Sequence, residues 1–511
     1  MRINCPARVA CIICALGLAG ELQAQFGPPP ASGQTPRVQP LPTSGRPSAG
    51  SVSTTQVPPG SNSTIQPTTQ VQGAYQGSAA HGTPDPKVLS LTLEDAIKRG
   101  LQYNLGAIGA GEAARQARAQ RLAAAAQMLP DIFGNVRESV QKINLAAQGF
   151  RITVPIPGFR FPTVIGPFNN FDARTSATES LSFTSFRNWQ SSREVAHSAE
   201  LSLQDSRDLV ALAVAGTYLQ IIASAARIDT AKAQLDTAQA VYQQAVDRNK
   251  SGLNARIDVN RSLVEFQSQQ QRLTSLTNDL EKQKLALARL IGLPMAQTFV
   301  LTDTVPYREL SLPNVDDLVQ RAVTDRADVR AAAAQQKAAE LSRGAAVAEY
   351  LPALELNGDY GVLGVTPTNQ AHGTYTAAGG IRIPIFRSGR TRADIEQADA
   401  ALAQRKAEYE DLKGRAEQDV RVAVLDLSAA SQLVKVADSN RALAADTLDQ
   451  ARDRFRSGVA DTIELVQAQE SVATAEQDYI SAVFASNLAQ VSLARAIGQT
   501  EKGITSLLQG K

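Results

Sequence analysis

The sequence contains one long pattern twice. Residues 245–259 read AVDRNKSGLNARIDV and residues 451–465 read ARDRFRSGVADTIEL, and the two align without a gap. The match continues to LALARLIG (285–292) and VSLARAIG (491–498) in the same register. In each copy a glycine separates two long stretches in which apolar residues recur every seven positions. This duplication predicts two copies of one unit, each a helical hairpin with the glycine at its tip.

The duplication also covers the residues upstream of each hairpin. The stretch that ends in QMLP (127–130) aligns without gaps to the stretch that ends in EYLP (349–352). Pro130 and Pro352 should each stop a helix, because proline lacks an amide donor and clashes with the preceding turn. After each proline, apolar and polar residues alternate, which is the period of a β-strand with two different faces.

Four strands are expected, at about 131–144, 171–185, 353–363 and 373–386. Each has on the order of ten to fourteen residues, enough to cross a bilayer when tilted. A half-buried sheet in a soluble protein gives the same alternation, but two matched hairpins in an exported chain favour a membrane barrel. Four strands are too few to close a barrel whose edges must not face lipid. Several chains should therefore share one barrel.

The N-terminus has the features of an export signal. Residues 1–24 combine Arg2 and Arg8 with the apolar run VACIICALGLAG and a small-residue cleavage site. The run is too short to span a membrane comfortably, which argues against the alternative of an N-terminal anchor. All three cysteines lie in this segment, so the mature chain should have neither disulfides nor thiolate metal sites.

The remaining chain divides by composition and by repeat. Residues 25–88 are rich in Pro, Gly, Ser, Thr and Gln and should form a disordered leader. A first repeat is expected over 89–294 and a second over 314–498, joined by an equatorial connector at 295–313. A short tail follows over 499–511. The formal net charge of +2 gives no electrostatic reason to expect nucleic acid as a partner.

These parts, in this order, resemble the TolC-like outer membrane efflux protein family. The resemblance covers about 90–498 and is carried by RNKSGLNARIDV (248–259) and RFRSGVADTIEL (454–465). It implies a mostly α fold with a transmembrane β-barrel, in which three chains form twelve strands continued by a long coiled-coil α-barrel. The chain would then lie in the outer membrane, with its helical barrel in the periplasm of a Gram-negative-type envelope.

The same resemblance implies a function and partners. The homotrimer would be the passive duct of a tripartite efflux or type I secretion system, in contact with outer membrane lipid. A periplasmic adaptor, coupled to an inner membrane pump, would open its tips. The alternative is an exported coiled-coil scaffold or a periplasmic adaptor without pore activity.

The resemblance also assigns the turn of each tip. Gly252 and Gly458 occupy the two turns. Together with Leu253, Val459 and Asp461 they are the candidates for docking the adaptor. A glycine there also suits any left-handed turn that ends a helix, and that role is compatible with docking.

Two acids are candidates for lining the periplasmic aperture. Asp258 and Glu464 match the family's acidic position, but a second acid one turn further on is replaced by Arg261 and by Gln467. Any ring of negative charge should therefore be thin or partly neutralised. A structural role is equally open, because Asp461 with Glu464 fits a capping box and Asp258 lies near a helix start.

One arginine in the last turn before each tip completes the candidate gate. Arg248 and Arg454 suit the negative end of a helix, or bridge to acids on neighbouring helices to hold a closed state. The three histidines, His81, His197 and His372, have no paired ligand spacing. The sequence therefore predicts no catalytic residues, no metal site and no cofactor.

Overall fold

The computed structural model describes residues 52–55, 68–147, 149, 162–252, 255–303, 305–309, 314–366, 371–457, 459, 462–500 and 503. Residues Met1–Ala49 and Gly50–Lys511 form separate units, and the described residues all belong to the second. The expected export signal lies outside them, and so does most of the expected tail.

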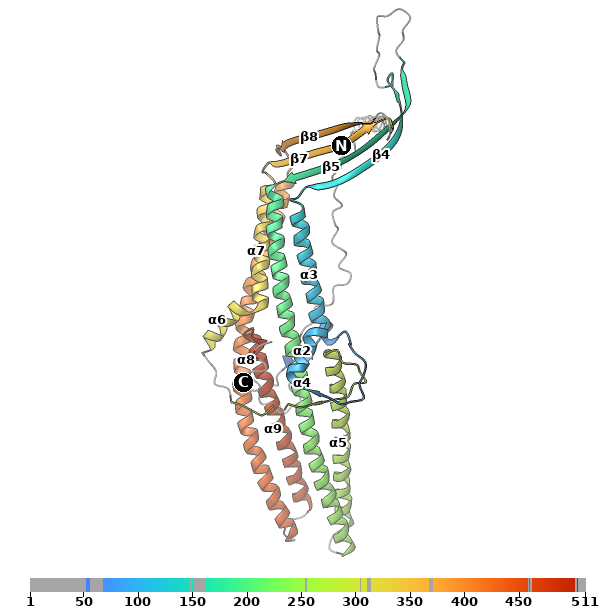
Figure 1. Cartoon of the computed structure of the whole chain (residues 1–511). Helices are drawn as coiled ribbons and strands as arrows, with labels where there is room; N and C mark the ends of the chain where they lie inside the picture. The colour runs from blue at the N-terminus through green and yellow to red at the C-terminus, as the bar shows by residue number, and fades with distance from the viewer. Residues whose placement is uncertain are drawn as a thin grey trace, which may run out of the picture. The chain divides into compact units, whose positions relative to one another are not determined.

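Two long helical hairpins form the body of this unit (Figure 1). The first consists of α4 (Phe183–Lys250) and α5 (Arg256–Leu290), and the second of α8 (Arg390–Arg456) and α9 (Thr462–Ala496). With 68 residues, α4 is about 100 Å long at ~1.5 Å per residue. The sheet lies at one end of α4 and the tip turn at the other (Figure 1).

The main core surrounds the middle of α4. Val214, Ile221 and Tyr218 are buried there against Leu287 of α5 and Leu488 of α9. Among the described residues, α4 is the one helix long and apolar enough to cross a membrane by length and composition alone, and 67% of its most apolar window is buried within the fold. The apolar character of α4 is thus explained by packing between helices.

Four shorter helices precede the strands or flank the core. They are α2 (Leu93–Tyr103), α3 (Leu105–Ala126), α6 (Val315–Asp325) and α7 (Ala327–Ala348). The Thr92 side chain caps α2 by accepting a hydrogen bond from the Asp95 amide, at 3.1 Å. In the second repeat, Asn314 caps α6 in the same way through the Asp316 amide. The matching caps show that the two repeats begin alike.

A four-stranded antiparallel sheet follows α3 and α7. Its order is β4 (Asp131–Asn144), β5 (Val164–Leu181), β7 (Ala353–Gly364) and β8 (Ala371–Arg382). All four expected strands are present, but both ends of β5 and both ends of β8 differ from the expectation.

At three of these four ends the expected bounds were wrong by four residues or more. β5 begins seven residues earlier than expected, because Val164 and Ile165 still pair with the end of β4. It ends at Leu181 rather than at 185, since Ser182 caps α4 by accepting from the Ser185 amide. β8 ends at Arg382 rather than at 386, before Pro384, which cannot donate to a ladder.

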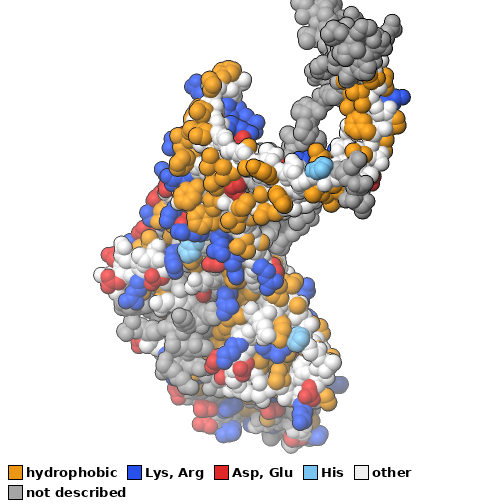
Figure 2. Space-filling model, turned by 45° about the horizontal axis from the view of Figure 1, so that its top comes forward, with side chains coloured by type: hydrophobic (Ala, Val, Ile, Leu, Met, Phe, Trp, Pro, Cys, Tyr) orange, Lys and Arg blue, Asp and Glu red, His pale blue; other side chains and the backbone are white. Residues whose placement is uncertain are grey.

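The register gives the sheet one mainly apolar and one mainly polar face. Because paired residues share a face, the first face carries Ile132, Val136, Val140, Ala173, Ala177, Leu354, Tyr360, Val362, Tyr375 and Ile381. The other carries Asn135, Arg137, Ser139, Asp172, Arg174, Asp359, Thr374 and Thr376. Many of the apolar side chains are exposed in the single chain, and Figure 2 shows hydrophobic groups gathered over this end of the molecule. Two faces of this kind suit a wall between lipid and water.

Part of the expected disordered leader is ordered, so that expectation was wrong for this part. It contains the antiparallel pair β1 (Val52–Thr55) and β2 (Thr68–Val71), and then the short helix η1 (Gly73–Gln76). Further on, β3 (Leu89–Leu91) pairs in parallel with β6 (Phe299–Leu301) of the equatorial connector. Residues 68–91, which we call the strap, thus run along the helical core.

Contacts with distant helices explain why the strap is ordered. Tyr75 is only 9% exposed, and its hydroxyl donates to Ser206 Oγ on α4 at 3.3 Å. Asn104 is fully buried and donates to the backbone oxygens of Tyr75 and Leu290, at 2.8 and 3.2 Å. The apolar surface that the strap needs is supplied by the rest of the fold, which local composition does not reveal.

Docking of the strap leaves no room for a side chain at one glycine of α4. A Cβ added at Gly216 would lie 2.0 Å from Thr69 Oγ1 and 2.8 Å from Thr69 Cβ. We expect Gly216→Ala to displace β2 and to destabilise the protein by about 1–3 kcal/mol, as overpacking does. Thermal unfolding in detergent and protease cleavage of the strap measure this.

The matched control is Gly414→Ala on α8, where an added Cβ meets nothing within 4 Å. That change should leave the protein equally or more stable, because alanine favours a helix by up to about 1 kcal/mol over glycine. Equal stability of both variants would contradict the close docking of the strap.

Candidate functional site at the helical tips

The first tip joins α4 to α5 through a left-handed turn. Gly252 has a φ of +71°, which favours glycine, and its amide donates to Asn249 O at 3.0 Å. The Ser251 hydroxyl donates to Asp247 O, also at 3.0 Å, and so satisfies a carbonyl of the last turn. The positive φ agrees with the role expected for Gly252.

Asp258 lies in the first turn of α5 and faces an arginine of the same helix. Its Oδ1 is 3.7 Å from Arg261 Nη1. Arg261 stands at the position where the family resemblance implies a second acid. The negative charge at this tip is therefore partly neutralised within the chain. The helix start also favours a negative charge here, so both roles considered for Asp258 remain compatible with its position.

The second tip is joined by an ion pair across its own hairpin. Arg454 Nε in the last turn of α8 lies 3.2 Å from Glu464 Oε1 in the first turn of α9. Both side chains are about half exposed, so the pair contributes below about 1 kcal/mol. A pair this weak can break without unfolding the hairpin.

A stronger contact holds the two tips of the chain together. The Arg248 guanidinium at the end of α4 lies 4.4 Å from the centre of the Phe455 ring on α8. Its Nη2 also donates to Phe455 O at 3.3 Å. Phe455 is only 4% exposed and packs with Leu448, Leu465 and other residues of the second hairpin. A cation over a buried ring, combined with a bond to a carbonyl at a helix end, favours the adjoining arrangement of the tips.

Sequence reasoning missed this contact. The seven-residue period indicates no more than an apolar position at Phe455, and Arg248 was expected to suit a helix end or to bridge to acids on neighbouring helices. The two repeats differ here, because Phe455 aligns with Asn249 in the first copy. That difference between otherwise matching tips is the signal that could have indicated a specific role.

The remaining tip candidates are only partly described. Val459 is 72% exposed at the second turn. Leu253, Gly458 and Asp461 lie outside the described residues, and so does the expected capping box of Asp461 with Glu464.

A second group of charges lies on the polar face of the sheet. Arg174 on β5 forms ion pairs with Asp172 of the same strand and with Asp359 of β7, the latter at 3.1 Å. Nearby, Arg382 pairs with Glu355. These residues were expected only as a polar alternation, and their pairing follows from the strand register.

The described part of the chain contains no group of three or more His, Cys, Asp or Glu residues placed to hold a metal. The described tips carry partly exposed charged groups, and the sheet carries exposed apolar side chains.

Comparison with known proteins shows which protein family this chain resembles. The sequence profile of the outer membrane efflux protein family matches residues 318–499. The chain is 28% identical over 421 residues to the pyoverdine export outer membrane protein OpmQ of Pseudomonas putida, covering 79% of this chain and 84% of the relative. By this profile match and this relative, the chain is similar to the outer membrane efflux protein family. It is an outer membrane channel component of an efflux system.

Solved structures agree with this assignment for the fold. The outer membrane channel CmeC of Campylobacter jejuni superposes with a TM-score of 0.71 at 15% identity, covering 80% of this chain and 86% of that one. The structure of CusC gives a TM-score of 0.67 at 19% identity, over 82% and 99% of the two chains. The family and its structural neighbours are channel proteins rather than enzymes, and the alternative of an exported scaffold or adaptor is set aside.

Proposed function

We propose that three copies of this chain form one tunnel that is closed at the tips when idle. A periplasmic adaptor, coupled to an inner membrane pump, docks on the tips and opens them. Transport through the outer membrane is passive, and the energy comes from the pump. The observation that carries this proposal is the sheet, which has one apolar face and two edges open for pairing.

The strand order supports sharing of a barrel between chains. β4 and β8 lie at the two edges of the sheet, and within the described residues each pairs on one side only. Unpaired backbone groups cannot face lipid, since each costs several kcal/mol there. Pairing of β4 of one copy with β8 of the next satisfies both edges, and three four-stranded sheets give the twelve strands of a closed barrel.

The helices carry a matching apolar stripe for a second copy. On α8 it consists of Val422, Leu425, Leu433, Val436 and Leu443, all exposed in the single chain. Their spacing of three, seven or eight residues keeps them on one side of the helix, as in a coiled-coil seam. Helices α3 and α5 lie on the opposite flank of the unit in Figure 1 and expose Leu122 and Val264. A ring of copies would bring these two flanks together.

The tips are the proposed gate and docking site. Asp258 and Glu464 would line the aperture, and the exposed Val459 would contact the adaptor together with the two turns. Opening separates the hairpins, so it must break the contact between Arg248 and Phe455. The weak pair of Arg454 with Glu464 permits rearrangement at small cost.

A charge in the α8 stripe tests the trimer. We expect Leu425→Glu to shift the protein in detergent from trimer towards monomer. The trimer would bury three copies of the new carboxylate between chains, and each buried carboxylate costs several kcal/mol unless it is paired. Light scattering coupled to size exclusion measures the mass. Ala442→Glu is the control: it is exposed on the same helix and lies about 100° round from the stripe residue Leu443, so this variant should remain trimeric. A wild-type protein that is monomeric in detergent would contradict the proposed function.

A further inference from the structure

One arginine is buried between the two hairpins with no acidic partner among the residues that the structure describes. Arg227 on α4 is 8% exposed, and its Nη2 donates to Ser481 Oγ on α9 at 3.1 Å. Its Nε is buried and has no hydrogen-bond partner among the described residues. Burial lowers the pKa of this guanidinium, and no neighbouring carboxylate offsets the effect. A buried charge left in this state costs several kcal/mol.

A second arginine approaches the same place from α5. Arg272 donates through Nη2 to Gln477 Oε1 on α9, one turn before Ser481. Within the described part of the chain, neither Arg227 nor Arg272 has a carboxylate oxygen within 4.0 Å. Helices α4 and α5 thus each place one arginine against α9, and no carboxylate of the described residues pairs with either of them.

Both arginines line a small cavity. Its volume is about 20 Å³, and it is bounded by α4, α5 and α9. A cavity needs about 10–15 Å³ to hold one water molecule, so this one has room for a single water or a monatomic ion but not for phosphate or a carboxylate. None of the nine residues that line it is acidic.

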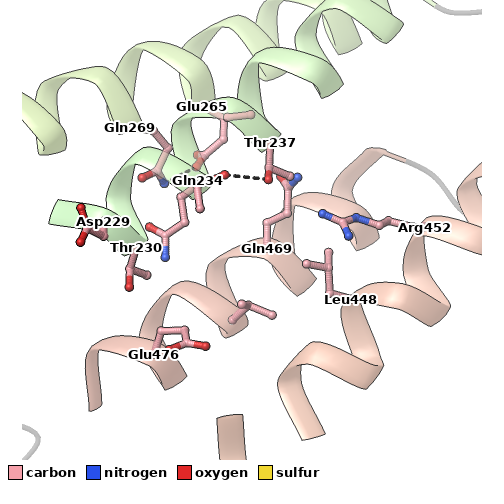
Figure 3. Close-up of a pocket in the computed structure, with 13 residues that line it drawn as sticks. Asp229, Thr230, Gln234, Thr237, Glu265, Gln269, Leu448, Arg452, Gln469 and Glu476 are labelled. Atoms are coloured by element: carbon pink, nitrogen blue, oxygen red, sulfur yellow. Dashed lines mark hydrogen bonds between the residues drawn. The ribbon is translucent and has the colours of Figure 1, made fainter. Parts of the chain in front are cut away.

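An unpartnered amide connects this cavity with a larger one. Gln234 lines both, and its Oε1 and Nε2 are buried without partners among the described residues. The larger cavity, of about 470 Å³, lies between the two hairpins (Figure 3). The acids of this region, Asp229, Glu265 and Glu476, line the larger cavity and not the small one. The lining of the small cavity thus offers no negative charge to the two arginines.

We propose that the small cavity binds one monovalent anion of the size of chloride, held by Arg227 and Arg272, with the Gln234 amide as a further donor. Arg227 comes from α4, Arg272 from α5, and their hydrogen-bond acceptors Ser481 and Gln477 from α9. The anion links the first hairpin to the second from within, above the tips. Separation of α9 from α4 and α5 would open the cavity and release it.

The first experiment compares anions at equal ionic strength. Thermal unfolding of the detergent-solubilised wild type is followed in sodium gluconate, with chloride replacing gluconate stepwise. The proposal expects a saturable rise of the melting temperature with chloride, since a ligand of the folded state stabilises by mass action. Gluconate is too large for the cavity. A melting temperature independent of the anion would overturn the proposal and leave a water molecule in the cavity.

The second experiment assigns the effect to the site. Arg227→Met and Arg272→Met should each lose the chloride-dependent rise, whereas Arg256→Met, at the exposed start of α5, should keep it. If Arg227→Met fails to fold, the Arg272 variant alone decides, because its side chain is only half-buried. Crystals of the wild type grown in sodium bromide should show an anomalous peak between Arg227 and Arg272. A chloride effect that persists in both methionine variants, or a bromide peak elsewhere only, would contradict the site.

The anion site lies within one chain, so its test is independent of the pore. A protein without channel activity could still show the chloride effect, and a working channel could lack it.

Discussion

Replacing Val136 with arginine is expected to abolish assembly of the channel in the outer membrane. Val136 lies in the middle of β4 on the apolar face and is 77% exposed in the single chain. An arginine on the lipid side of a barrel costs about 2–4 kcal/mol at the bilayer midplane. A trimer carries three copies, so the penalty is roughly 6–12 kcal/mol for one barrel, comparable to the whole stability of an ordinary domain.

The control for this variant lies three residues further along the same strand. Ser139→Arg places the same charge on the polar face, where it meets water rather than lipid. We expect this variant to assemble at the wild-type level. Membrane fractionation and trimer bands on unheated gels measure both. Normal assembly of Val136→Arg would contradict the assignment of the apolar face to lipid.

Truncating Phe455 is expected to loosen the tips without unfolding the molecule. The ring is buried between Arg248 of α4 and the apolar residues of the second hairpin. Phe→Ala changes at buried sites cost about 3–5 kcal/mol, and here the loss also removes the cation–ring contact. The contact joins the hairpins, so we expect faster tryptic cleavage at Arg454 and Arg456 and faster amide exchange near both tips.

Phe266→Ala is the matched control for this prediction. Phe266 on α5 stacks on Tyr242 of α4, with ring centres 6.1 Å apart, and both belong to the first hairpin. Its removal should weaken that hairpin and leave tryptic cleavage of the second tip unchanged. Equal protection of the second tip in the wild type and in Phe455→Ala would argue that the ring does not hold the hairpins together.

The sequence was sufficient to predict the architecture because its signals are periodic. Apolar residues at every second position indicate all four strands. In each repeat, the proline that ends the upstream helix (Pro130 or Pro352) indicates where the first strand begins. The seven-residue period places residues such as Val214 and Val420 in buried positions, as the structure shows. The duplication supplied a second, independent copy of each signal, so a chance pattern in one half could be recognised.

Contacts between distant segments could not be predicted in this way. The strap has the composition of a disordered segment, and its order depends on contacts with distant residues, such as the burial of Tyr75 and the pairing of β3 with β6. The pairing of Arg248 with Phe455 joins positions 207 residues apart, and no local pattern encodes it. No local pattern marks the two arginines of the proposed anion site as neighbours, because their meeting depends on the positions of α4, α5 and α9.

The most direct test of the account is the single-channel conductance of the purified protein in a planar lipid bilayer. The wild type is compared with the double variant Asp258→Ala/Glu464→Ala, which removes the acids proposed to line the aperture. The account predicts small, cation-preferring wild-type currents that become larger and less selective in the double variant. The absence of any current from correctly folded trimers, or currents identical in both proteins, would contradict a tunnel closed at these tips.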